Sequence, residues 1–70
     1  QGPLNIIVSP LRHTRKNLEQ IRDILKRYPG RSKVNLTIKD SLGHSQILEL
    51  DERFRVNRCP ELETELSMYN

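Results

Sequence analysis

The segment most suggestive of chemistry is the basic turn at residues 29–33, PGRSK. A phosphate-binding loop needs several glycines, so that backbone N–H groups converge on the anion, and it leads into the N-terminus of a helix. This turn has one glycine and connects a helical pattern to a strand pattern, which is the opposite polarity. The sequence therefore favours a simple connection between a helix and a strand, in which Pro29 ends the helix and Gly30 gives the chain the conformational freedom to reverse.

The residues that could act as a nucleophile, a base or a metal ligand do not form a catalytic pattern. His13 and His44 are far apart, each in a polar connection, and no serine or carboxylate stands at a spacing typical of a triad. Cys59 precedes Pro60 at the expected start of a helix, where we interpret it as an N-cap occupant or a partly buried small residue. Three glutamates in residues 61–65 alternate, so they do not converge on one point of a helix. The sequence predicts no catalytic residue, no metal site and no cofactor.

The uneven distribution of basic side chains is the one pattern that indicates a binding function. Most of them lie in the first half of the chain. Residues 1–39 carry nine basic and two acidic side chains, a net charge of +7, whereas residues 40–70 carry three basic and seven acidic ones, a net charge of −4. We expect one basic and one acidic face. Six basic residues on the outer face and at the far end of the first helix are candidates for contacting a partner or DNA phosphates: Arg15, Lys16, Arg22, Lys26, Arg31 and Lys33.

Readout of nucleic-acid bases is not expected from this pattern. Only Phe54 offers an aromatic ring among the extended segments, whereas domains that bind single strands stack several bases on aromatic platforms. The most that the cations indicate is attraction to a phosphate backbone. A solvated helix face and a protein contact stay open as alternatives.

Alternating apolar residues predict the strands. Residues 4–8 (LNIIV) and 34–39 (VNLTIK) each have the period of two that is typical of a strand, and a glycine-tipped hairpin at residues 40–44 leads to a third strand at residues 46–50 (QILEL). Residues 54–56 form a fourth extended piece whose pairing stays open. The third segment resembles glutamine-containing peptides that dock on sliding clamps, but we interpret it as an internal strand whose apolar side chains are already buried.

Two helices complete the predicted order. The first follows Thr14 as N-cap and keeps apolar residues at helical spacing as far as Tyr28, with Asp23 and Arg27 four residues apart as an expected ion pair. The second begins at Pro60. The order β-α-β-β-(β)-α predicts an α+β fold, a small mostly antiparallel or mixed sheet of three to four strands with two helices on one face.

Length and composition limit the functional classes. Seventy residues make one small domain, placed at residues 4–69, whose core supplies only roughly 3 to 5 kcal/mol. Residues 1–3 (QGP) are interpreted as the remnant of a cleavable expression tag, so we expect a domain excised from a larger chain. With no apolar stretch that could span a membrane and a single cysteine, the sequence predicts a soluble, cytoplasmic protein with no membrane contact and no small-molecule substrate.

The order of these segments resembles the C-terminal domain of bacterial replicative DNA polymerase III alpha subunits. The resemblance covers essentially residues 4–69, and it depends on the order and spacing of several short anchors rather than on any one of them. These anchors are Pro29-Gly30 after the first helix, Val34 in the next strand, Phe54-Arg55-Val56, and Pro60-Glu61-Leu62 at the start of the second helix.

The resemblance implies a non-catalytic module. In that family the polymerase carboxylates lie in a separate palm domain, and the C-terminal region connects the polymerase to the tau subunit of the clamp loader. The resemblance therefore implies that this fragment is not itself an enzyme, that its parent chain is a DNA-directed DNA polymerase of DNA replication, and that tau and other replicase subunits are its partners. Cys59 stands where a small capping residue such as serine is usual in the family, and the first helix is more basic than usual.

Two functions stay open at this point. One is a protein-protein interaction domain that couples the polymerase to the clamp loader. The other is a basic domain that contacts DNA phosphates without sequence specificity. A small independent enzyme is disfavoured, because no nucleophile is aligned with a base. Neither the binding face nor the oligomeric state is predicted.

Overall fold

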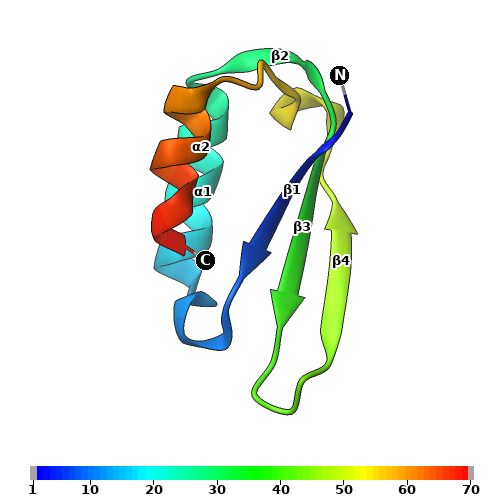
Figure 1. Ribbon diagram of the computed structural model, residues 1–70, viewed down its shortest axis with the longest axis vertical. Helices are drawn as coiled ribbons and strands as arrows, with labels where there is room; N and C mark the ends of the chain where they lie inside the picture. The colour runs from blue at the N-terminus through cyan, green and yellow to red at the C-terminus, as the bar shows by residue number, and fades with distance from the viewer. Residues whose placement is uncertain (1, 70) are drawn as a thin grey trace.

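The protein is a mixed three-stranded sheet with two helices on one face (Figure 1). The structure is a computed structural model that describes residues 2–69. Its strands and α-helices are β1 (Leu4–Val8), α1 (Arg15–Lys26), β2 (Pro29–Ser32), β3 (Val34–Lys39), β4 (Ser45–Glu49) and α2 (Pro60–Leu66). Three short 3-10 turns are η1 (Pro10–Arg12), η2 (Glu52–Phe54) and η3 (Ser67–Tyr69). The predicted α+β class is confirmed.

The sheet has the strand order β1-β3-β4. β1 and β3 are parallel, with Leu4 opposite Val34, and α1 lies in the crossover between them. β3 and β4 are antiparallel, with Leu36 opposite Leu48, and a short hairpin joins them. The central strand is therefore β3, and β1 and β4 are the two edges.

The hydrophobic core lies between the helices and the inner faces of β1 and β3. Every second residue of β1 is buried, as expected for a strand with one face against helices. Leu25 of α1 and Leu62 of α2 are completely buried. The other buried core residues are Leu4, Ile6, Val8, Ile21, Ile24, Val34, Leu36, Val56, Leu66 and Tyr69.

The two helices begin where the sequence predicts. The Thr14 hydroxyl accepts a hydrogen bond of 3.1 Å from the Asn17 backbone N–H, which caps the N-terminus of α1. Pro60 occupies the first turn of α2, where its missing N–H is not needed. Cys59 is the N-cap of α2, as predicted, but its side chain makes no capping hydrogen bond. Neither helix within residues 2–69 has the length and apolarity that crossing a bilayer demands.

The turn predicted at residues 29–33 contains a strand, β2. The Gly30 N–H donates to the Arg55 carbonyl at 3.1 Å, and the Asn57 N–H donates to the Tyr28 carbonyl at 2.8 Å. A Cβ at Gly30 would lie only 2.3 Å from the Asn57 backbone nitrogen. Glycine is therefore required at this position for a close approach of two backbones, and not for the reversal of direction that we predicted. Among residues 2–69, the one glycine with positive φ is Gly43, at 85°, in the β3–β4 hairpin.

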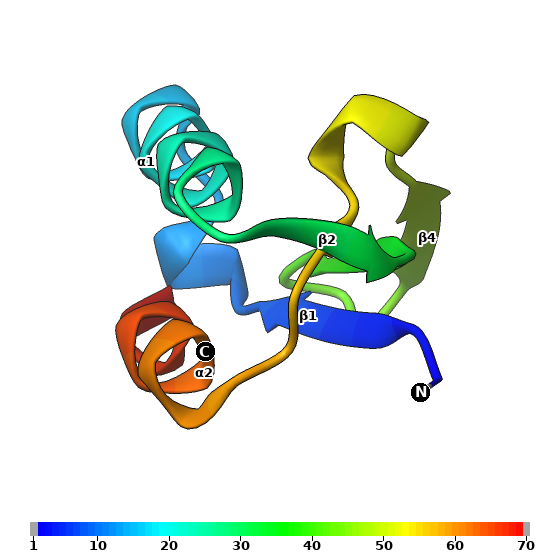
Figure 2. The same cartoon turned by 90° about the horizontal axis from the view of Figure 1, so that it is seen from above.

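The fourth extended piece does not join the sheet. Phe54 belongs to the 3-10 turn η2, and Val56 forms isolated bridges with Pro29 and Ser32 at the two ends of β2. Figure 2 shows β2 and the segment before α2 crossing above one end of the sheet. The bridges hold β2 against the segment that precedes α2, and Val56 is completely buried.

Two further predictions are wrong. Arg27 forms its ion pair with Glu65 of α2 rather than with Asp23, so the helix-helix contact replaces the expected pair within α1. The segment QILEL is not an internal strand with buried side chains, because β4 lies at the edge of the sheet and each of its five residues is exposed.

Candidate functional site

An open apolar groove lies between α1 and β4. Its volume is about 620 Å³. In Figure 2 both helices stand on the β1 side of the sheet, and β4 is the strand farthest from them. The apolar side chains that line the groove include Leu18, Leu36, Ile38, Leu48, Leu50 and Phe54.

The groove is open because two helices cover only part of a three-stranded sheet. α1 and α2 bury the inner faces of β1 and β3, whereas within residues 2–69 the inner face of β4 is covered only in part. Leu48, whose side chain faces inward, is therefore 38% exposed. Leu50 and Phe54 are half-buried and pack against the core at one end of the groove.

β4 also presents unpaired backbone groups. The Leu50 N–H donates to the Val34 carbonyl at 2.9 Å, and the Asp40 N–H donates to the His44 carbonyl at 2.9 Å. Because backbone groups alternate in direction along an antiparallel strand, the even-numbered residues of β4 pair with β3. The N–H and C=O groups of the odd-numbered residues, Ser45, Ile47 and Glu49, therefore point to the open edge.

Two arginines and one carboxylate line the groove, and Arg53 beside it pairs with Asp51 at 3.8 Å. Arg15 and Arg22 of α1 line it, together with Glu19, which pairs with the Arg15 guanidinium at 3.3 Å. At the other end the Lys26 ammonium lies 5.9 Å from the centre of the Phe54 ring, and the Arg53 guanidinium lies 5.7 Å from it. Arg15 is almost fully exposed, so its pair with Glu19 contributes little to stability and leaves the guanidinium accessible.

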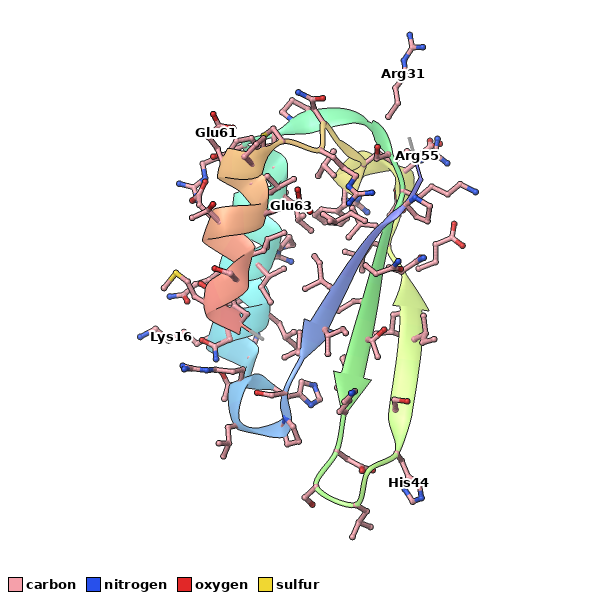
Figure 3. All side chains as sticks on the ribbon, in the orientation of Figure 1. Lys16, Arg31, His44, Arg55, Glu61 and Glu63 are labelled. Atoms are coloured by element: carbon pink, nitrogen blue, oxygen red, sulfur yellow. The ribbon has the colours of Figure 1, made fainter. Side chains whose placement is uncertain are left out.

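The structure divides the six predicted contact residues between different places. Three of them lie at helical spacing on one side of α1 and border the groove: Arg15, Arg22 seven residues later, and Lys26 four residues after that. Lys16 points away from the sheet on the helical side of the molecule, and Arg31 projects outward from β2 at the opposite end (Figure 3). The sixth, Lys33, is exposed between β2 and β3.

The two histidines, distant in sequence, border the same hollow in the structure. His13 and His44 line a small hollow of about 280 Å³ together with Asp40, and the His44 Nδ1 lies 3.4 Å from an Asp40 carboxylate oxygen. Within residues 2–69, no group of side chains is arranged to hold a metal ion. Glu61 and Glu63 point in different directions (Figure 3), and the Glu63 carboxylate lies 3.4 Å from the Arg58 guanidinium.

Sequence reasoning missed the groove and the open edge. The available signal was the pair Ile47 and Leu48, two consecutive apolar residues that necessarily face opposite sides of a strand. A strand with apolar residues on both faces needs two covering layers, and residues 2–69 provide β4 with only part of one. Ile47 is 69% exposed as a result.

Comparisons of the chain with protein-family models, with curated proteins and with solved structures give no match.

Proposed function

We propose that this chain is a non-catalytic module of a DNA polymerase III alpha subunit, and that it binds protein. Its role is to help couple the replicative polymerase to the tau subunit of the clamp loader. The observation that carries the proposal is the α1–β4 groove, an apolar surface with a cationic rim beside an unpaired strand edge. An exposed apolar patch with a polar rim is typical of a surface that binds another protein.

The choice of partner comes from the family resemblance. The anchors PG, FRV and PEL stand in the same order as in the C-terminal domains of alpha subunits, and those domains connect the polymerase to tau. On this proposal the parent chain is a cytoplasmic DNA-directed DNA polymerase, and the carboxylates of the present domain take no part in nucleotidyl transfer.

Isothermal titration with the C-terminal region of tau from the same organism tests the proposal. At about physiological salt we expect saturable binding with one site. A tau fragment that lacks this C-terminal region is the matched control and should give no heat. Absence of binding by a domain whose circular dichroism shows it to be folded would contradict the proposal.

Contact with DNA phosphates is a second candidate function. The observation that favours it is the row of Arg15, Arg22 and Lys26 along one side of α1. Fluorescence anisotropy of a labelled single strand and a labelled duplex tests it. Binding through phosphates should weaken steeply with salt, and loss of one contact should reduce the slope by about one. Unchanged anisotropy at low salt would reject this function.

A further inference from the structure

We infer that β4 binds an extended acidic peptide, which adds to the sheet as a fourth strand and places alternate apolar side chains in the α1–β4 groove. The inference deepens the proposed function and rests on it only in treating the domain as a protein-binding module. It does not depend on the partner being tau.

The backbone of β4 provides the directional part of the interaction. Ser45, Ile47 and Glu49 each direct an N–H and a C=O to the open edge, and an extended peptide can pair with all of them. Strand addition of this kind gains affinity from backbone hydrogen bonds and specificity from pockets for alternate side chains. The five residues of β4 provide a pairing length that is typical of a strand.

The other sheet edge is less suitable. β1 is bordered by α2, and the hollow between them has a volume of about 230 Å³. Leu4 and Ile6 are buried there, and Glu63 supplies negative charge. An incoming strand would find little free apolar surface at β1, whereas β4 offers a larger groove beside it.

The groove provides the side-chain part of the interaction. Because side chains alternate between the two faces of a strand, every second residue of an added peptide would point to the inner face of the sheet. There it would lie beside Leu48 and Leu50 and opposite the apolar side of α1. Aliphatic residues at these positions would cover the exposed surface of Leu48.

The charges around the groove favour an acidic occupant. Arg15 and Arg22 line the groove and Lys26 borders it, and among the side chains of residues 2–69 only Arg15 of these three has a carboxylate partner, Glu19. A second copy of this chain would bring the same cationic rim against itself, which is unfavourable. A nucleic acid cannot form the alternating N–H and C=O pairing that β4 offers. A peptide whose inward-facing positions carry carboxylates beside aliphatic residues satisfies both the backbone and the charges.

The experiment is a titration of the isotope-labelled domain followed by backbone amide resonances. One probe is a capped peptide in which threonine alternates with a second set of positions that carries valine and glutamate in turn, so that the face toward the groove presents both aliphatic side chains and carboxylates. Its control has lysine in place of glutamate, and a third probe is the C-terminal region of tau. We expect the glutamate peptide to shift the amides of Ser45, Ile47 and Glu49 in a saturable manner. The lysine peptide should leave them unshifted.

Two variant pairs separate this mode from other contacts. Ile47→Pro removes an N–H that faces the open edge, and proline is tolerated in an edge strand on that side. It should weaken binding about five- to tenfold, as expected for one lost hydrogen bond, while Ile47→Ala keeps the N–H. Arg22→Glu should weaken binding roughly tenfold, whereas Lys16→Glu, the same charge change on the far side of α1, should not.

The outcomes distinguish the inference from the proposed function. If tau does not bind and the glutamate peptide does, the coupling to tau is rejected and the inference stands. If tau binds and neither Ile47→Pro nor Arg22→Glu weakens it, the inference is overturned and the proposed function stands. The inference is also overturned if the glutamate peptide leaves β4 unshifted, if the lysine peptide binds equally well, if DNA shifts the same amides, or if these amides shift with protein concentration alone.

Discussion

The Tyr28 hydroxyl donates a hydrogen bond to the Glu65 carboxylate, which joins the end of α1 to α2. The Arg27 guanidinium contacts the same carboxylate, so Glu65 of α2 binds two consecutive residues at the C-terminal end of α1. This hydrogen bond, with partial burial and the negative charge of Glu65, raises the pKa of Tyr28 above its ordinary value of 10.0. The protonated hydroxyl is therefore part of the contact between the two helices.

Stability should fall at alkaline pH because of this contact. Because the pKa of Tyr28 is raised in the folded state, its contribution to the free energy of unfolding is complete below pH 10.0. This contribution is lost as the pH rises through the folded-state pKa. Urea unfolding at several pH values above neutrality should show this loss for the wild-type protein. Tyr28→Phe should reduce the slope at alkaline pH.

Tyr69 supplies the matched control for this prediction. Its hydroxyl donates to the neutral Gln20 side chain at 2.9 Å, so Tyr69→Phe should leave the alkaline slope due to Tyr28 intact. The Tyr69→Phe variant also leaves a single tyrosine whose titration can be followed by ultraviolet absorbance. A midpoint at or below pH 10.0 in that titration would contradict the proposed role of Glu65.

Substitution of Gly30 should destabilise the fold through overlap of backbones. Gly30→Ala places a Cβ 2.3 Å from the Asn57 nitrogen and 2.5 Å from the Val56 carbonyl carbon, so β2 and the segment at Val56 must separate. We expect the free energy of unfolding to fall by about 1 to 3 kcal/mol in a denaturation experiment. Gly2→Ala, with no atom within 4 Å of the added Cβ, should have little effect. Equal denaturation midpoints for the Gly30→Ala and Gly2→Ala variants would show that β2 and the Val56 segment do not approach each other as described.

Truncation in the core should unfold most of the protein. Leu25→Ala removes side-chain volume from a completely buried position of α1, which costs about 2 to 5 kcal/mol. A domain of this size has roughly 3 to 5 kcal/mol available. Circular dichroism should therefore show a large loss of helix, whereas Leu42→Ala, at a position that is 80% exposed, should retain the wild-type spectrum. A stable Leu25→Ala variant would place the core elsewhere.

Cys59 offers a stabilising substitution. Its backbone has the extended conformation of an N-cap, at φ −152° and ψ 160°, but the thiol makes no capping hydrogen bond. Cys59→Ser should add one and raise the free energy of unfolding by about 0.5 to 1 kcal/mol in urea titrations. Cys59→Ala provides no cap and should bring no gain. If the alanine variant is as stable as the serine variant, packing rather than capping decides the effect at this position.

Most of the fold could be predicted from local patterns. The alternation in residues 4–8 and 34–39 specified two strands, and for residues 34–39 it also gave the observed inner face. In residues 4–8 the apolar Ile7 suggested partial burial of both faces, but Ile7 is exposed. Thr14 and Pro60 marked the starts of both helices. These signals are contained within a few consecutive residues. The glycine at position 43 likewise indicated the hairpin, because the turn needs a positive φ there.

The predictions that failed depended on contacts between distant segments. β2 forms because residues 29–32 meet Val56, and nothing near Gly30 in the sequence indicates that neighbour. Arg27 had a local candidate in Asp23, but the fold brings Glu65 closer. The groove could not be predicted because it depends on where two helices lie across three strands, which is a property of packing rather than of any one segment.

The two edges of β3 differ in how they can form during folding. Its pairing with β4 needs only the closure of a short hairpin, which is a local and rapid event. Its pairing with β1 must wait for a crossover that contains all of α1 and β2, and closing that long loop costs more chain entropy. We therefore expect β3 and β4 to associate first and β1 to add late, when α1 docks on the sheet. The strand edge that lies open in the finished domain thus belongs to the hairpin that folds earliest.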